Sequence, residues 1–392
     1  MGLAPLSQQR RRLGCIVLTT QDAKTEILIE VFLPMLNSAV CTKLKFIVGV
    51  AVFLPCASLL IPASEGPCAN QEANQLLQRG RDTFPKGGYG APPTVAAAGR
   101  ALTYFDLAVE KDPACAQAHV AQAQAYADFP SWPGVPPAER FVKVQSAAAK
   151  AIELQGNLAP AHLLLALAEF NTGQWAQAEK EFKRAIQLAP SDAPAHASYA
   201  RYLAAMGHFD EAIAEMEQAR KLAGGTPRFS LAAGEIYYWA RRYDRAIELI
   251  RPAVDASPIG NFLLGWAYVG KSEWDEAIRA FEKELPLADR DAGALMSLAY
   301  AYAAAGRRSE VPKLLEEAKE KTNRMYVPVY RIAAVYVALS DKDQAIEWLE
   351  KAYHDDFGWM VWLKVDPVMA PLRSEPRFQD LLRRMNFPSE LK

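Results

Sequence analysis

A pattern of 34 residues recurs in the middle of this chain. Residues 159–192 and 193–226 both open with Ala-Pro-Ala-His, and alanines recur at matching places, at Ala166 and Ala200, Ala178 and Ala212, and Ala185 and Ala219. A period of this length with small residues at helical spacing predicts a unit of two helices joined by a turn. Such a unit buries its apolar face only against its neighbours, so the pattern predicts a stack of helix pairs, a solenoid.

The same pattern, less regular, extends over eight units within residues 65–365. Each unit carries a small residue where its two helices approach and a large apolar residue that fills the gap to the next unit. The small residues are Ala166, Ala200, Gly234, Gly265, Ala299 and Ala333, and the large ones are Phe182, Met216, Ile250, Phe281 and Leu315. Gly173, Gly207 and Gly306 fall where the turn between two helices is expected.

The small–Tyr–Gly–Ala–Phe–Ala–Pro pattern over residues 97–356 resembles the tetratricopeptide repeat. The resemblance implies an all-α fold, a right-handed superhelical solenoid of helix–turn–helix repeats in which the first helix of each repeat lines a concave groove. Two features depart from the family pattern. The first two units carry inserted loops, and Pro252 lies inside a second helix, which it is expected to kink.

The end of the chain, residues 366–392, is expected to form a C-terminal cap. The stretch LKVDP and the later LRSEPRFQDLLRRM resemble the closing cap of bacterial tetratricopeptide proteins of signalling and regulation, although Val368, Met369 and Ala370 replace the usual Arg-Phe-Asp. We expect a polar-faced helix over residues 376–385 to cover the exposed end of the stack.

The N-terminal residues carry the pattern of a targeting segment. Residues 46–62 are apolar, Lys43 and Lys45 precede them, and small residues follow, an order typical of a secretory signal. The apolar stretch is broken by two prolines and is short for a spanning helix. Residues 35–64 are therefore expected to be a cleaved signal peptide or an uncleaved membrane anchor, and a cytosolic protein is the remaining alternative. Met35 is the expected translation start, which would leave residues 1–34 as an untranslated leader.

Export would place the chain in the periplasm, or in a membrane facing the periplasm. Only two of the five cysteines, Cys68 and Cys115, follow the targeting segment. An oxidising compartment allows them to form a disulfide between the first helix and the second unit, and two unpaired thiols are the alternative. No Cys-x-x-Cys occurs, so a zinc or thioredoxin-like site has no support.

No motif supports catalysis, a metal or a cofactor. Residues 265–272, GWAYVGKS, match a phosphate-loop pattern but fall along a predicted helix rather than after a strand. His119, His162 and His196 occupy one place in successive units, and helices packed about 10 Å apart cannot bring three such side chains to one ion. We interpret these histidines as helix-packing residues. The chain is expected not to be an enzyme.

The candidate binding residues are large or charged side chains that follow the core positions of the first helices, toward the concave groove. Aromatic and arginine side chains often anchor a partner. The candidates are Arg201, Glu235, Tyr238, Trp239, Trp266, Met296, Tyr300, Tyr330 and Arg331. For any one of them, packing against the neighbouring first helix is the alternative.

These features predict a non-enzymatic, exported scaffold that binds a protein or peptide in its groove and is a monomer. A formal net charge of −1 argues against a nucleic-acid partner, and membrane contact is expected only through an uncleaved N-terminal segment. The alternative is the repeat or sensor half of a bacterial signalling or transcription-regulatory system that acts through a separate effector chain.

Overall fold

The computed structural model describes residues 67–84, 95–128, 137–256, 259–288, 290–322, 329–355 and 357–388. The chain divides into two units, residues 1–61 and 62–392, and every described residue belongs to the second. The expected leader and targeting segment, residues 1–34 and 35–64, lie outside the described part. Within that part, no helix combines the length and the apolar character needed to cross a membrane.

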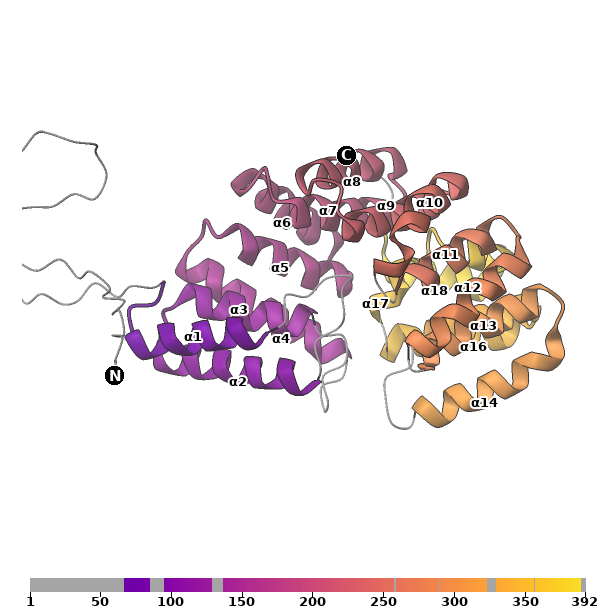
Figure 1. The fold of residues 1–392 in the computed structure, drawn as a ribbon, viewed down its shortest axis with the longest axis horizontal. Coiled ribbons are helices and arrows are strands. Elements are labelled where there is room, and N and C mark those ends of the chain that lie inside the picture. The colour runs from indigo at the N-terminus through magenta and orange to yellow at the C-terminus, as the bar shows by residue number, and fades with distance from the viewer. Residues whose placement is uncertain are drawn as a thin grey trace, which may run out of the picture. The chain divides into compact units, whose positions relative to one another are not determined.

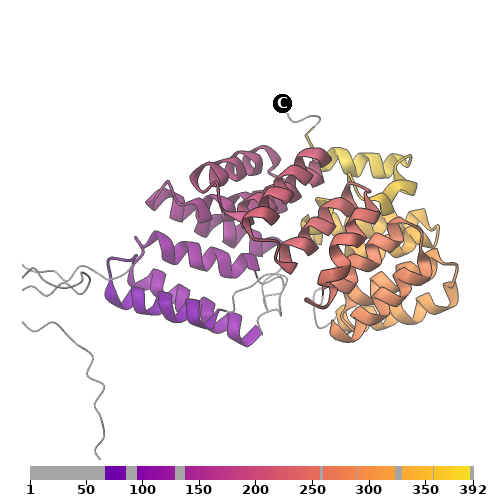
Figure 2. The same cartoon turned by 45° about the horizontal axis from the view of Figure 1, so that its top comes forward.

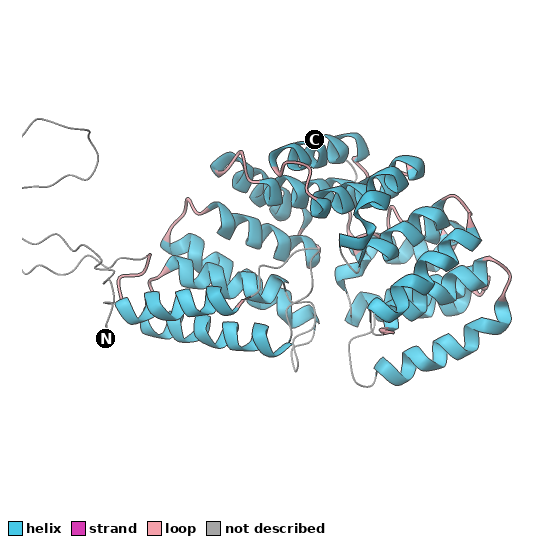
Figure 3. Cartoon of the chain, in the orientation of Figure 1, coloured by secondary structure: helices cyan, strands magenta, loops and turns pink. Residues whose placement is uncertain are grey.

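The described residues form helices and no strand (Figures 1 and 3). Sixteen of these helices make eight consecutive pairs. The pairs are α1 (Gln71–Thr83) with α2 (Val95–Lys111), α3 (Ala116–Asp128) with α4 (Pro137–Leu154), α5 (Ala159–Asn171) with α6 (Trp175–Leu188), α7 (Ala193–Met206) with α8 (Phe209–Leu222), α9 (Pro227–Trp239) with α10 (Tyr243–Ile250), α11 (Ile259–Gly270) with α12 (Trp274–Leu287), α13 (Ala292–Ala304) with α14 (Val311–Thr322), and α15 (Val329–Ala338) with α16 (Lys342–Asp355).

Each pair packs on the pair that follows it. Each first helix contacts its own second helix and the first helix of the next pair. From α2–α3 to α12–α13, each second helix also contacts the first helix of the following pair. Figure 2 shows the stacking from a second direction. The prediction of an all-α solenoid of helix pairs is confirmed.

The small residues of the repeat do allow the two helices of a pair to approach. A Cβ atom added to Gly234 would lie 2.3 Å from Cγ1 of Ile250, and one added to Gly265 would lie 2.4 Å from the Phe281 ring. The side chain of Phe281 is fully buried. Small and large residues therefore interlock within a pair, because protein interiors are packed without spare room.

Pro252 ends a second helix early. The α-helical part of α10 stops at Ile250, and the chain continues as a 3₁₀ helix, η1 (Arg251–Ala256). Proline has no N–H to donate and its ring collides with the carbonyl one turn earlier. The fifth pair therefore has a short second helix, and the main chain at Val254 passes directly over Gly260 of α11.

A disulfide joins the first helix pair to the second. Cys68 and Cys115 are bonded at an S–S distance of 2.05 Å, with their Cα atoms 4.9 Å apart. Between them, the Asn70 side chain accepts hydrogen bonds from the backbone N–H groups of Glu72 and Ala73 and so caps α1. The Asn70 N–H itself donates to Asp112 at 3.0 Å. The start of α1 is thus fixed to the connection between α2 and α3.

The chain ends in a segment of short helices, α17 (Phe357–Met360), η3 (Pro367–Leu372) and α18 (Pro376–Met385). Helix α18 packs on α16 with its Phe378 and Leu381 side chains buried. Two ion pairs, Lys342–Glu375 at 2.7 Å and Arg384–Glu350 at 2.5 Å, border this contact. Helix α18 therefore lies against the last helix pair, where a cap is expected.

Candidate binding groove

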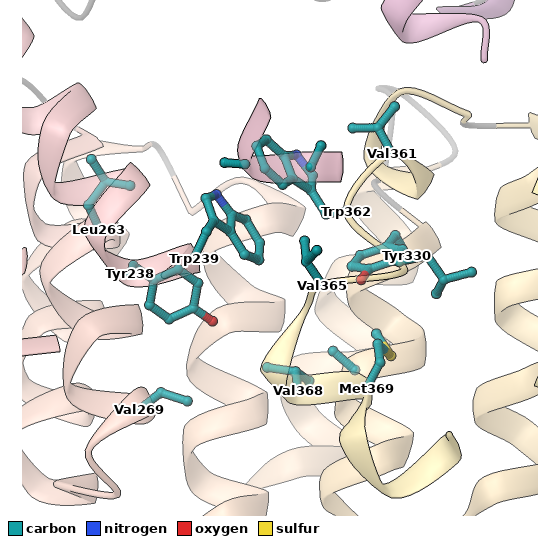
Figure 4. Packing of buried hydrophobic residues seen from close by; sticks show 14 of the residues in the cluster. Tyr238, Trp239, Leu263, Val269, Tyr330, Val361, Trp362, Val365, Val368 and Met369 are labelled. Carbon is teal, nitrogen blue, oxygen red and sulfur yellow. The ribbon is translucent and has the colours of Figure 1, made fainter. Parts of the chain in front are cut away.

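The C-terminal segment, residues 357–388, lies across the face formed by first helices. Helix η3 packs on α15. The Trp362 ring stacks on Trp239 of α9 with centroids 4.4 Å apart, and Figure 4 shows both rings beside Val365 and Val368. Near the end of the segment, Phe387 stacks on Trp175 of α6 at 4.9 Å. The segment therefore joins the third and fifth helix pairs to the eighth.

Hydrogen bonds fix this segment at several points. The Trp175 indole N–H donates to the Met385 carbonyl at 3.0 Å, and the Lys364 ammonium donates to the Met206 carbonyl at 3.3 Å. The Tyr330 hydroxyl donates to Oδ2 of Asp366 at 2.7 Å, while the Val368 N–H donates to Oδ1 of the same carboxylate. Burial raises the pKa of Asp366, and these two hydrogen bonds oppose that rise.

Most of the residues that the sequence places in the groove are not open to solvent. Six of the nine candidates are buried, namely Tyr238, Trp239, Met296, Tyr300, Tyr330 and Arg331. Arg201, Glu235 and Trp266 are partly exposed. The repeat register correctly places the candidates on the face of the first helices. The C-terminal segment and the neighbouring first helices, however, cover much of that face. Replacing both Trp266 and Tyr300 by alanine would therefore remove packed rings, 5.1 Å apart, rather than free binding residues.

Arg201 and Glu235 form an ion pair between successive first helices. Their charged atoms are 3.3 Å apart, and the Arg201 side chain is 43% exposed, compared with 13% for Glu235. The Arg201 guanidinium also lies 5.7 Å from the centre of the Trp362 ring. The pair therefore borders the C-terminal segment, and its arginine is the more exposed of the two side chains.

A cavity of about 60 Å³ remains between the C-terminal segment and α9, α11 and α15. Trp239, Trp266, Arg331 and Trp359 are among the residues that line it, with Asp366 from the segment. The cavity holds more than one water molecule, since one needs about 10–15 Å³ of such space. Six of the thirteen residues that line it are aromatic, so its walls are largely apolar.

Arg331 lies between two aromatic rings at this cavity. Its guanidinium carbon is 4.3 Å from the centre of the Phe262 ring and 4.5 Å from that of Trp359. One terminal N–H donates to the Ser297 hydroxyl at 3.0 Å, and the Nε–H has no acceptor. Burial lowers the pKa of this arginine. Cation–π contacts on both faces stabilise the charge.

Apart from Phe262 of α11, the main residues at this face that the sequence did not indicate belong to the C-terminal segment. Trp359, Trp362 and Asp366 contribute to the cavity or to the covering of α9, although the sequence analysis assigned this region only to the end of the stack. A signal was present, because residues 357–369 contain nine large apolar side chains. A polar-faced cap does not need so many, and their number indicates a segment buried on more than one side.

The repeated histidines bind neighbouring groups of the protein. Nδ1 of His162 is 2.5 Å from Glu181 and its Nε2 is 3.2 Å from the Gly156 carbonyl, and His196 makes the matching contacts with Glu215 and the Pro190 carbonyl. In the described part of the chain, no three His, Cys, Asp or Glu side chains are grouped to hold a metal ion. The phosphate-loop-like stretch lies along α11 and the turn after it.

Comparisons with known proteins agree with this architecture. Models of the tetratricopeptide repeat match residues 159–192, 199–259, 262–319 and 329–353. No curated protein matches the sequence.

Among solved structures, human IFIT1, solved as a dimer with m7Gppp-AAAA, is 15% identical, with a TM-score of 0.54 over 72% of each chain. Yeast Tom70 is 14% identical, with a TM-score of 0.47 over 82% of this chain and 69% of Tom70. The protein TTC0263 of Thermus thermophilus is 19% identical, with a TM-score of 0.41 over 50% of this chain and 98% of that one. At such identities the likeness to IFIT1 concerns the fold alone.

Proposed function

This chain is a tetratricopeptide repeat protein, and from that premise we propose that it is a non-enzymatic, exported scaffold that binds a protein or peptide on the face of its first helices. A stack of helix pairs offers an extended surface without a catalytic centre of its own. The surface left for a partner is smaller than the sequence suggests, because the C-terminal segment covers part of it and makes contacts as far as α4 and α6.

The observation that carries the proposal is that this face already holds a polypeptide. Residues 359–372 lie along it through ring stacking, as between Trp362 and Trp239, and through side-chain hydrogen bonds to backbone carbonyls, as from Lys364. These are the contacts by which a groove recognises a peptide, with large apolar anchors in a water-excluding surround. A separate polypeptide would use the same kinds of contact on the part of the face that remains open.

We place the partner on the first helices of the second and third pairs, where side chains remain partly exposed, although α17 contacts α4 of the second pair. Gln124 of α3 and Leu167 of α5 are partly exposed, and the repeat register places them in line with Arg201. We expect the partner to contact these positions beside the C-terminal segment. An apolar or aromatic anchor would suit Leu167, and an acidic group would suit Arg201.

Cross-linked affinity capture from the native cells tests the proposal, with one substitution made at two places. Gln124→Arg puts a long charged side chain on the first-helix face in place of a partly exposed side chain hydrogen-bonded to Asp128, and Gln187→Arg makes the same change on an exposed position of the second helix α6. We expect Gln124→Arg to lose the captured partner at least about tenfold and Gln187→Arg to keep it, with helical circular dichroism unchanged in both.

Equal capture by both variants would place the partner elsewhere on the molecule and reject this surface. The N-terminal peptide of the recovered protein is read in the same experiment. A mature terminus near residue 65 supports export with cleavage, and a terminus before residue 46 on a soluble cytosolic protein contradicts export.

A further inference from the structure

The last described residues, 386–388, are held less firmly than the helix that precedes them. Helix α18 buries Phe378 and Met385, whose side chains are 0% and 2% exposed. After Met385 the chain leaves the helix through Asn386, which is exposed and has a left-handed φ of 50°. Phe387 and Pro388 are only partly buried. The firmly packed part of the C-terminal segment therefore ends at Met385.

Two specific contacts hold residues 387 and 388. The Phe387 ring stacks on Trp175 with the ring centroids 4.9 Å apart and the planes 16° from parallel. The Pro388 carbonyl accepts a hydrogen bond from the Lys364 ammonium at 3.4 Å. Within the described part of the chain, Phe387 itself makes no hydrogen bond. One ring stack and one long hydrogen bond stabilise these two residues only weakly, because each such contact contributes little.

The Trp175 ring beneath Phe387 is held in place by other parts of the protein. Its indole N–H donates to the carbonyl of Met385, the last residue of α18, at 3.0 Å. The Trp175 backbone carbonyl accepts from the buried Tyr202 hydroxyl at 3.1 Å. Trp175 therefore keeps its position when Phe387 leaves, and it then presents one flat ring face.

A cation lies beside this ring face. The Lys364 ammonium donates to the Met206 carbonyl, at the end of α7, and to the Pro388 carbonyl. Among the described residues it forms no ion pair with a carboxylate. An ammonium carries three donors and no acceptor, so Lys364 can donate to any carbonyl that replaces the one of Pro388. A ring face and a cation thus contact two successive residues of a bound chain.

This site adjoins the proposed partner surface. Helix α5 ends at Asn171, and Trp175 begins α6 four residues later. Leu167, which belongs to the partner surface, lies about one helical turn before Asn171. A polypeptide that contacts Leu167 therefore needs only a few further residues to reach Trp175.

We propose that residues 386–388 are an exchangeable occupant of this site, and that the partner carries an aromatic side chain that replaces Phe387 on Trp175. The carbonyl of the partner's next residue then accepts from Lys364 in place of Pro388. The inference rests on the proposed function, because it concerns the partner and the regulation of the same surface. Tethered beside the site, the occupant has an effective concentration in the millimolar range, so it lowers the apparent affinity for the partner without preventing binding.

The test uses the full chain and an acetylated synthetic peptide with the sequence of residues 386–392, NFPSELK. Phe387→Ala removes the ring from the occupant and leaves Trp175 and Lys364 in place. We expect this variant to bind the peptide with a dissociation constant of about 1 mM or tighter, measured by calorimetry. The unmodified protein should bind the peptide at least about threefold more weakly, because its own Phe387 competes.

Three comparisons locate the binding. A peptide with alanine in place of its phenylalanine should bind to Phe387→Ala at least about fivefold more weakly than NFPSELK. Adding Lys364→Met to Phe387→Ala should weaken the binding of NFPSELK about three- to tenfold. Tyr104→Ala, which removes a partly exposed ring on α2, should bind the peptide no better than the unmodified protein.

The proposal is overturned if Phe387→Ala binds NFPSELK no better than the unmodified protein does, or if it binds the alanine peptide equally well. A dimer of the unmodified protein that forms with rising concentration and is lost in Phe387→Ala would assign the site to a second copy of this chain. That result would overturn the assignment to a separate partner.

The outcome is separable from the test of the partner surface. Peptide binding to Phe387→Ala, with capture unaffected by Gln124→Arg, would support this site and reject the surface on α3 and α5. Loss of the captured partner in Gln124→Arg, without peptide binding to Phe387→Ala, would reject this site and leave the partner surface supported.

Discussion

At the residue scale, one position in the turn between the two helices of a pair is glycine in some pairs and another residue in others. Gly173, Gly207 and Gly306 occupy it with positive φ angles of 76°, 92° and 80°. Arg241, Ser272 and Ser340 occupy it in the other pairs, at 57°, 60° and 68°. The left-handed region is unfavourable for residues with a side chain, so these three turns cost stability that glycine would avoid.

A pair of exchanges measures that cost. Ser340→Gly should raise the free energy of unfolding by about 0.5–1 kcal/mol, because the relief of strain exceeds the added freedom of the unfolded chain. Gly306→Ser should lower it by a similar amount. Urea denaturation followed by circular dichroism gives both values, and a loss of stability in Ser340→Gly would contradict the strain argument.

The buried carboxyl of Glu284 predicts a dependence of stability on pH. Burial raises its pKa from 4.5 to about 8, and one of its oxygens has no hydrogen-bond partner. A group whose pKa is higher in the folded than in the unfolded state stabilises the fold fully below the unfolded pKa. That contribution falls as the pH rises from about 4.5 and is lost as the pH passes about 8.

Glu284→Gln, which is neutral at every pH, tests this dependence. We expect the variant to be at least about 1 kcal/mol more stable than the unmodified protein at pH 8, and the difference to shrink toward pH 5. Denaturation at four pH values between these limits gives the slopes. Glu282→Gln, on the exposed side of the same helix, is the control and should leave the slope unchanged.

At the scale of the element, the disulfide determines how firmly the first helix is held. Reduction of the Cys68–Cys115 bond should lower the stability of the first two helix pairs by about 2–4 kcal/mol. Hydrogen exchange measured with and without reductant should show faster exchange in α1 and little change in α15. Equal exchange in α1 under both conditions would mean that the Asn70 cap and its contact with Asp112 suffice.

The helices themselves were predictable from the sequence, since a 34-residue period sets where each helix must begin, turn and end. Gly234 and Gly265 pack against Ile250 and Phe281 as the repeat predicts. The break at Pro252 follows from proline chemistry and appears as the change from α10 to η1. In each of these cases the cause lies within one or two repeats, and a sequence pattern reports such local causes well.

The environment of the groove was less predictable. Register indicates toward which face Trp239 or Arg331 points, but it does not reveal what covers that face. The cover is a segment more than 100 residues away from Trp239 in the sequence, and no period relates Trp362 to it. The prediction therefore identified the right face and left out the chain that lies on it.

At the scale of the whole described unit, the C-terminal segment adds contacts that a linear stack lacks. In a simple solenoid each repeat contacts only its neighbours. Here Trp175 donates to the carbonyl of Met385, 210 residues later. Helix pairs that are distant in the sequence are thereby linked, so their unfolding should be more cooperative than that of a linear stack.

Trp362→Ala tests this link. The side chain is 2% exposed and stacks on Trp239, so we expect a loss of about 3–5 kcal/mol. Amide exchange should accelerate both in the C-terminal segment and at the end of α9, while α1 and α2, which the segment does not contact, keep their protection. Trp348→Ala, a partly exposed tryptophan on α16, is the control and should cost about 1 kcal/mol without affecting α9. Effects confined to residues near position 362 would disprove the long-range coupling.

The late position of Trp362 in the chain has a consequence during synthesis. A ribosome adds about 5–20 residues per second, so the 123 residues from Trp239 to Trp362 take roughly 6–25 s. The middle repeats can fold in that time, but Trp239 stays uncovered until Trp362 has been synthesised, and Trp175 until Phe387 has been synthesised. The nascent chain therefore exposes an aromatic surface to which chaperones can bind throughout that interval. A chain truncated before residue 357 would keep this surface exposed permanently.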